Sequence, residues 1–239
     1  MTQLDALVFA RCAGFLFRAP GFSHPSVPPM VRAGLALVFT LGLVHGVAHD
    51  VTLAPVIFAL ALAGEIAIGA AIGIGASVLY DGAYAGGRLI EDYVGIRASV
   101  PSASVQPASG FGRLWSLVFL AGFFLLDGYH IVIRVFADGL TRIPPGATLT
   151  SHALVDFAIG LPTMIVHAAL LITGPAILVI FIIQIGLAAI ARVVPRFATF
   201  SLSFPIVFAA VLIVTMVAVP LLFGLAGHPW FDLPFLGLR

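Results

Sequence analysis

The sequence predicts an all-α integral membrane protein with about six apolar segments, some of them bent or broken. Hydrophobic residues make up 61% of the 239 residues and charged residues 9%, and the mean hydropathy is +1.17. A soluble domain of this size could not cover so much apolar surface with so few charges. The net charge of +1, without a lysine or a basic cluster, argues against a nucleic-acid-binding surface. We therefore expect a single membrane domain over residues 1–239.

Short polar or proline-rich links separate the apolar segments. The first segment lacks the basic start of a cleavable signal peptide, so we expect it to remain as a membrane-embedded helix. The third is followed by a stretch with helical spacing of apolar side chains, residues 83–96. The fifth carries Pro162 and Pro175, and we expect a bend or a break near each. The segments are residues 4–17, 30–44, 51–79, 114–136, 153–191 and 200–225.

The loop between the third and fourth segments is the longest stretch that is too irregular to lie in lipid as an apolar helix. Pro101, Pro107, Gly110 and Gly112 forbid a continuous helix there. At membrane depth, non-helical backbone survives only when it is buried in protein or lines an aqueous path. We therefore interpret this loop, near residues 97–112, as the closure of a pore. The expected pore-loop residues are Ser99, Val100, Pro101, Ser102, Ala103, Ser104, Val105, Gln106, Pro107, Ala108, Ser109 and Gly110.

Glu65 lies inside the third segment, where an ionised carboxylate costs roughly 2.5–3.5 kcal/mol on insertion scales. It must therefore face protein or water, or be protonated. Three interpretations stay open: a buried partner for an arginine such as Arg11 or Arg88, a proton-relay acid, or a polar helix-packing group. We favour the structural pair because no second intramembrane carboxylate lies one turn away. The residues expected to be buried polar or structural are Glu65, Arg88, Asp127 and Arg192.

Glycines recur on one face of the third segment and its continuation. Pairs spaced four apart let another helix approach closely, and such a face suggests helices that bury against other subunits. A nucleotide-binding fingerprint is excluded because no strand precedes these glycines. The expected helix-packing glycines are Gly64, Gly69, Gly73, Gly82, Gly86 and Gly87.

No pattern in the sequence supports catalysis. His45 and His49 are four residues apart with Asp50 adjacent, which could place two metal ligands on one helix face. Their link is short, however, and the other histidines form no matching pair. Glu91 and Asp92 are neighbours, so they point apart on a helix and do not form an acid–base pair. We expect no catalytic residue, cofactor or metal.

Five short motifs, in order along the chain, resemble one family of membrane proteins. They are Phe15-Leu16-Phe17-Arg18-Ala19-Pro20-Gly21 with Val27-Pro28 and Arg32; Gly64-Glu65 with Gly69 and Gly73; residues 85–95; Asp127-Gly128-Tyr129-His130 with Ile143-Pro144-Pro145-Gly146; and residues 192–197 with Phe204-Pro205. The chain is similar to the FliR/SctT family of type III export-gate membrane proteins over nearly its whole length. His130 and the stretch 205–207 are closer to its flagellar members. Arg196, Ala198 and Gln106 depart from the residues usual in the family.

The resemblance implies a structural, non-enzymatic subunit of the export gate of a flagellar type III secretion apparatus. It implies a place in the bacterial inner membrane, within the flagellar basal body, and a role in flagellum assembly. Residues 1–152 would be a FliP-like part whose loop contributes to a plug, and residues 153–239 a FliQ-like hairpin and tail. The implied partners are FliP-like, FliQ-like, FlhB-like and FlhA-like proteins, membrane lipid and unfolded export substrates.

Other functions stay open at this point. One is an export-apparatus subunit of an injectisome, SctT-like and from the same family. Another is a small-molecule secondary transporter with Glu65 as its coupling acid, which is less favoured because the segment-five prolines have no counterpart in the first three segments. A third, weaker still, is an intramembrane enzyme using His45, His49 and Asp50.

Overall fold

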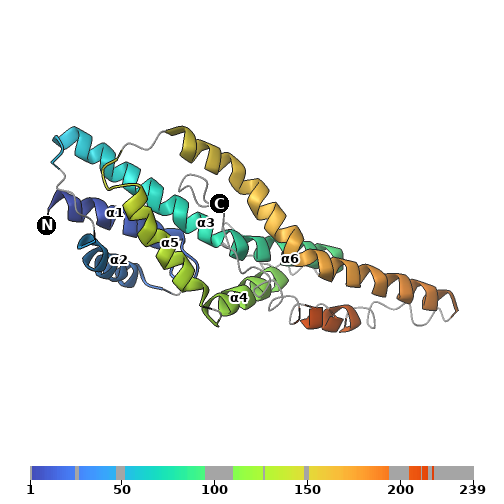
Figure 1. The fold of residues 1–239 in the computed structure, drawn as a ribbon. Coiled ribbons are helices and arrows are strands. Elements are labelled where there is room, and N and C mark those ends of the chain that lie inside the picture. The colour runs from blue at the N-terminus through green and yellow to red at the C-terminus, as the bar shows by residue number, and fades with distance from the viewer. Residues whose placement is uncertain are drawn as a thin grey trace. The chain divides into compact units, whose positions relative to one another are not determined.

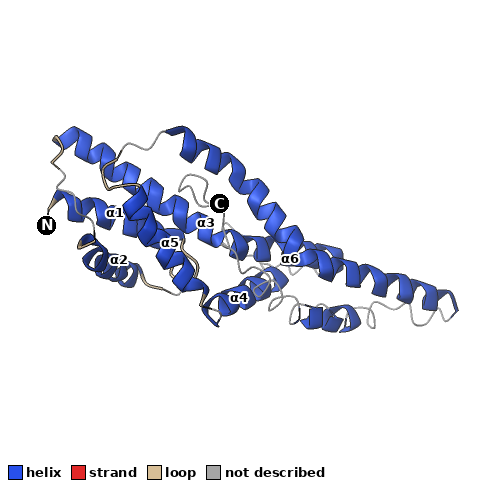
Figure 2. Ribbon diagram, in the orientation of Figure 1, coloured by secondary structure: helices blue, strands red, loops and turns tan. Residues whose placement is uncertain are grey.

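The computed structural model describes residues 2–24, 27–46, 52–94, 110–125, 127–147, 151–193, 205–210, 212–214 and 217. Within these ranges all regular structure is helical, as predicted (Figures 1 and 2). The helices are α1 (Gln3–Arg18), α2 (Pro29–Val44), α3 (Pro55–Val94), α4 (Gly110–Leu125), α5 (Gly128–Arg142) and α6 (Ser151–Val193). Residues 205–210 and 212–214 are also helical and belong to the expected sixth segment.

The limits of α1 and α2 follow from local signals. Thr2 caps α1 by accepting a hydrogen bond from the backbone N–H of Asp5, and the Asp5 carboxylate accepts one from Thr2, which together form a capping box. Helix α2 begins at Pro29, whose missing N–H would have no partner in the first turn. Both helices match the first two expected segments to within a residue or two at each end.

Helix α3 is longer than the third expected segment. It has 40 residues, so it is about 60 Å long at about 1.5 Å per residue, against roughly 30 Å for a hydrocarbon core. Most of the stretch 83–96, for which the sequence indicates helical spacing, forms its C-terminal part. No proline interrupts the chain between Pro55 and Val94, so nothing in the backbone forces the helix to end earlier.

The fourth expected segment, residues 114–136, is wrong as a single element. The structure has two helices here, α4 and α5, with Asp127 just before α5 in the left-handed conformation at φ 57°. A left-handed residue cannot continue a right-handed helix, and aspartate is among the few residues that adopt this conformation readily. Asp127 and Gly128 therefore interrupt an apolar run that hydropathy alone treats as continuous.

Helix α6 is one helix of 43 residues, so the chain does not break at Pro162 or Pro175, and a bend near either proline stays a prediction. Each proline removes one backbone hydrogen bond and crowds the carbonyl four residues earlier. In apolar surroundings, ending the helix would leave many more backbone groups without partners. The rest of the hydrogen-bond ladder therefore keeps α6 helical through both prolines.

The chain divides into two compact units, while the division expected near residue 152 stays a prediction. The first unit combines Met1–Val78 with Asp127–Pro162, and the second combines Leu79–Leu126 with Thr163–His228. In the first unit, the buried rings of Phe15 and Phe136 stack with centroids 4.4 Å apart and join α1 to α5. In the second, the largest buried side chain is Trp115.

Two helices of the described chain, α3 and α6, are long and apolar enough to cross a membrane. Their candidate spans are Pro55–Glu91 and Leu154–Ile190, and α4 and α5 pass the same test only when taken together. Large apolar side chains stand exposed on both long helices, Leu60 and Ile182 among them. This pattern suits helices that face lipid or other apolar protein.

Candidate functional site

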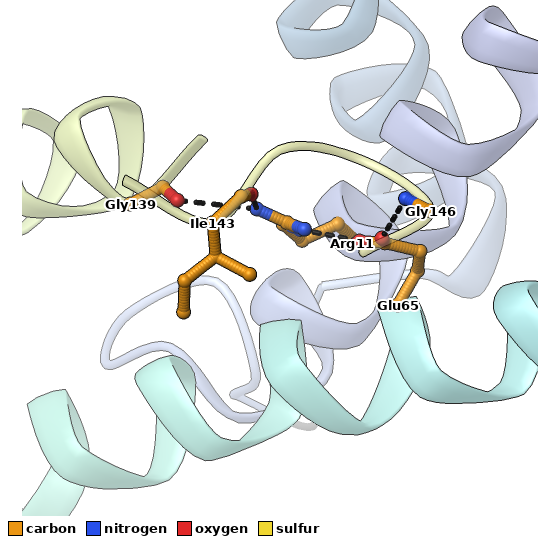
Figure 3. Close-up of polar contacts among 5 residues, drawn as sticks. All are labelled: Arg11, Glu65, Gly139, Ile143 and Gly146. Carbon is orange, nitrogen blue, oxygen red and sulfur yellow. Dashed lines mark hydrogen bonds and ion pairs between the residues drawn. The ribbon is translucent and has the colours of Figure 1, made fainter. Parts of the chain in front are cut away.

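The centre of the first unit is a buried ion pair between Arg11 on α1 and Glu65 on α3. The Arg11 Nε–H donates to Glu65 Oε2, and the two side chains are 0% and 1% exposed (Figure 3). Of the two arginines that the sequence offered as partners for Glu65, Arg11 is the one in contact. Removing either member of such a pair leaves an unmatched charge in an apolar interior, at a cost of about 3–5 kcal/mol.

The Arg11 guanidinium also binds the C-terminal end of α5. Its Nη1 donates to the carbonyl oxygens of Ile143, at 2.7 Å, and Gly139, at 3.2 Å (Figure 3). The last carbonyls of a helix have no partner within the helix and carry partial negative charge. Arg11 therefore satisfies these carbonyls and the Glu65 carboxylate at once, and it joins three helices of the first unit.

Glu65 completes the cluster through the turn that follows α5. Its Oε1 accepts a hydrogen bond from the backbone N–H of Gly146 at 2.8 Å. Gly146 has φ 84°, and the N–H of Ala147 donates to the carbonyl of Pro144 at 3.0 Å. Pro145 followed by a glycine at positive φ is the signature of a type II turn. The turn therefore presents its central N–H to the carboxylate.

The cluster has the form of a structural clamp. Both Glu65 oxygens accept hydrogen bonds, one from the Arg11 guanidinium and one from the Gly146 backbone, so the side chain is held in one position. Within the described part of the chain, the buried Nη2 of Arg11 has no hydrogen-bond partner. These contacts join Glu65 to α1 and to the turn after α5.

Close contact between α1 and α3 surrounds the ion pair. A Cβ added to Gly69 would strike the carbonyl oxygen of Arg11, and one at Gly73 would lie 2.5 Å from the carbonyl oxygen of Phe15. Gly14 on α1 packs closely against α3 from the other side of the same contact, because a Cβ there would strike the carbonyl oxygen of Ile66. The sequence analysis suggested that this glycine face buries against other subunits. In the structure, Gly69 and Gly73 face a helix of the same chain.

The glycines further along α3 make close contacts inside the second unit. A Cβ at Gly82 would lie 2.7 Å from the Cβ of Ala168, and one at Gly86 would strike the side chain of Thr173. Gly87 approaches the start of α4 in the same way. Gly64 is the exception among the expected packing glycines, because a Cβ there would meet no atom within 4 Å among the described residues.

The remaining expected site residues are exposed or lie outside the described part of the chain. Arg88, Asp127 and Arg192 are exposed in this chain, whereas Glu65 is buried. Of the pore loop, residues 99–109 lie outside the described residues, and Gly110 is the first residue of α4. His49 and Asp50 also lie outside the described residues.

The contacts of Arg11 and Glu65 with the far end of α5 were not predicted from the sequence. Gly139 and Ile143 contribute only backbone carbonyls, which any residue carries, so the sequence holds no signal for them. The Pro144-Pro145-Gly146 run is of a composition typical of turns. It could not indicate that the Gly146 N–H would face a carboxylate on α3.

Comparison with known proteins gives the same family as the motifs. The model of the family described as bacterial export proteins, family 1, matches residues 4–232. The flagellar biosynthetic protein FliR of Escherichia coli (strain K12) is 26% identical over 229 residues, 91% of this chain and 85% of that protein. The FliR of Aquifex aeolicus (strain VF5) is 24% identical over 230 residues, 90% of this chain and 85% of that protein. The chain therefore belongs to the bacterial export proteins, family 1, the FliR/SctT family that its motifs resemble.

Proposed function

We propose that this chain is a structural subunit of the export gate of a flagellar type III secretion apparatus and is needed for flagellum assembly. The observation that carries the proposal is the family match across residues 4–232. Both relatives named above are flagellar proteins and align over about nine tenths of the chain. This agreement favours the flagellar apparatus over the injectisome.

The proposed location is the bacterial inner membrane, within the flagellar basal body. Helices α3 and α6 meet the length and hydropathy required of membrane spans. Apolar side chains stand exposed on α2 as well, with Met30 85%, Val38 61% and Leu41 59% exposed. In water such a surface would drive aggregation, whereas lipid or neighbouring apolar helices cover it without cost.

The proposed role is to form a protein-conducting pore together with FliP-like and FliQ-like subunits, next to FlhB-like and FlhA-like proteins. Unfolded export substrates would pass through the shared pore, with energy supplied elsewhere in the machine. The loop of residues 99–110 would close the pore at rest. Pro101 and Pro107 cannot donate backbone hydrogen bonds, and the serines offer only short polar side chains. Few contacts would then have to break when a passing chain displaces the loop.

The contacts of Glu65 weigh against the transporter alternative. A coupling acid must gain and lose its proton during transport, in contact with an aqueous path. Glu65 is 1% exposed and bonded to both Arg11 and Gly146. Holding helices together is the role these contacts favour, and it requires no chemical step.

Two experiments test the assignment. One is deletion of the gene, and the other is co-expression of the protein with its proposed partners. Cells lacking this chain should lose flagella and swimming, and the intact gene should restore both. Co-expressed with FliP-like and FliQ-like subunits, the chain should co-purify as a large complex, whereas alone it should aggregate. Normal flagella in the deletion strain together with lost effector secretion would move the assignment to an injectisome. A monodisperse monomer in detergent would contradict the assembly.

Deleting residues 101–107 tests the pore loop separately. A loop that merely connects two helices tolerates shortening with little thermodynamic effect. If the loop closes the pore, the shortened chain should assemble and yet leave cells more permeable to ions and small solutes. An assembled complex whose membrane stays as tight as that of the intact chain would show that this loop is not the closure.

A further inference from the structure

Helix α5 carries a charged face in a chain that is otherwise poor in charge. Three of its 15 residues are charged, Arg134, Asp138 and Arg142, against 9% of the whole sequence. Positions three or four apart share one face of a helix, and the exposed positions of α5 follow that spacing. They are His130, Ile131, Arg134, Asp138, Thr141 and Arg142. The opposite face of α5 is buried, so its charges lie on the outside of the first unit.

Arg134 and Asp138 have no partner for their charges among the described residues. Both side chains are exposed, and neither has a hydrogen bond or an ion pair there. The backbone carbonyl of Asp138 accepts from the Thr141 hydroxyl at 2.8 Å, which leaves the carboxylate available. At the start of the helix, by contrast, His130 lies 3.7 Å from Asp127. The middle of the face therefore holds a cation and an anion, about one turn apart, that bind nothing in the described part of the chain.

The charged face of α5 does not suit lipid. Charged side chains in the hydrocarbon layer are costly, and they pair with protein groups or face water instead. Other helices of the first unit expose the opposite kind of surface, with Val38 and Leu41 on α2 and Leu60 on α3. Water or another protein, rather than lipid, therefore covers the exposed face of α5.

The charges decide which kind of protein fits this face. Arg134, Asp138 and Arg142 together carry a net positive charge, which two copies of the chain would bring against each other. This disfavours a second copy and favours a partner whose face is net negative. The chain has no lysine, so both cations are guanidinium groups, which bind carboxylates through two parallel hydrogen bonds. A helix with a carboxylate at one position and a cation one turn away matches Arg134 and Asp138 in charge and in spacing.

We infer that the exposed face of α5, centred on Arg134 and Asp138, is a docking surface for such a helix of a neighbouring subunit. Charge pairs across an interface contribute more to the choice of partner and its register than to affinity. The buried face holds α5 to α1 through Phe136 and through the Arg11 contacts, so a fixed helix presents the charges. The identification of the partner as an export-gate subunit rests on the proposed function, whereas the charged face is a property of α5 itself.

The first experiment finds what covers the face. The photo-crosslinking residue p-benzoylphenylalanine replaces Arg134 or Asp138 and is activated in intact cells of the bacterium that makes this protein. Mass spectrometry should place both crosslinks on one helix of another protein, close to an aspartate or glutamate. The same probe at Leu60, an exposed apolar position on α3, is the control and should not reach that helix. Crosslinks to lipid alone, to a second copy of this chain or to nothing would overturn the proposal.

The second experiment tests whether charge makes the contact. Arg134→Glu and Asp138→Arg should each lower the recovery of FliP-like and FliQ-like subunits with this chain by about tenfold or more, because like charges then oppose each other. Arg134→Lys should stay close to the intact chain, and Arg134→Gln should lie between. Reversing the charge of the carboxylate mapped by the crosslink should restore recovery with Arg134→Glu. Equal recovery for the glutamate, glutamine and lysine variants would contradict a charge contact.

Folding and assembly are separated by a control on the chain itself. Because Arg134 and Asp138 are exposed, none of these substitutions should change the temperature at which the detergent-extracted chain is lost from solution. If the intact chain recovers neither subunit, the assignment to the export gate fails, and the helix crosslinked in the native cells, with its compensating reversal, still decides the docking surface. If the intact chain and Arg134→Glu recover the subunits equally, the docking surface is wrong and the assignment stands.

Discussion

Glu65 on α3 accepts a hydrogen bond from the backbone N–H of Gly146, at 2.8 Å and 81 positions later in the sequence. The same carboxylate faces the guanidinium of Arg11, which itself binds the last carbonyls of α5 (Figure 3). One buried acid thus fixes the turn after α5 against α1 and α3. The stability of the first unit should therefore respond to each member of this cluster.

Glu65→Leu should destabilise the chain much more than Glu65→Gln. Leucine leaves the buried Arg11 guanidinium without a counter-charge, at a cost of about 3–5 kcal/mol. Glutamine keeps an oxygen that can still accept from Arg11 or Gly146. The check is the temperature at which detergent-extracted chain is lost from solution, with Arg88→Leu as an exposed control. Equal losses for leucine and glutamine would contradict the clamp, and lost export from a normally assembled Glu65→Gln complex would favour a proton-handling role.

Gly69→Ala should be destabilising, whereas Gly64→Ala should be nearly neutral. The alanine Cβ at Gly69 strikes the carbonyl of Arg11, and that at Gly64 meets open space within the described chain. Overpacking costs typically about 1–3 kcal/mol, and here the obstacle is backbone, which yields little. Denaturation by increasing sodium dodecyl sulfate in mixed micelles measures the difference. An equal response at both glycines would mean that α1 does not pack on α3 at Gly69.

Gly146→Ala should weaken the turn that Glu65 binds. Gly146 adopts φ 84°, and left-handed backbone costs an alanine about 1–2 kcal/mol. Gly160→Ala is the matched control, because Gly160 lies in α6 with open space around its Cβ position among the described residues. Protease digestion between residues 143 and 150 should become faster for Gly146→Ala alone. Unchanged digestion would contradict the turn conformation.

Phe15→Ala should cost far more stability than Phe17→Ala, although the two residues are neighbours on α1. Phe15 is 0% exposed and its ring stacks on Phe136, whereas Phe17 is 67% exposed. Truncating a buried phenylalanine costs about 3–5 kcal/mol, and an exposed one changes stability by roughly 0.5 kcal/mol or less. The measurement is the temperature at which each detergent-extracted variant is lost from solution. Similar values would place Phe15 outside the core.

Composition and local signals determined the class of the protein and its first helices. With 61% hydrophobic and 9% charged residues the chain is suited to a membrane, and its long apolar segments can satisfy their backbone there as helices. The prolines and polar residues that bound α1 and α2 act within a few positions, so the sequence places these ends to within a residue or two. Motifs spread along the chain were enough to identify the family.

Only the tertiary structure decided which distant residues meet. The sequence offered Arg11 and Arg88 equally as partners for Glu65, and Arg11 is the one whose guanidinium donates to it. It listed Gly64 with Gly69, although only Gly69 has another helix against it. Nor did hydropathy reveal the left-handed Asp127 that separates α4 from α5. In each case the outcome depends on how helices pack in three dimensions, and residue type and spacing along one helix do not carry that information.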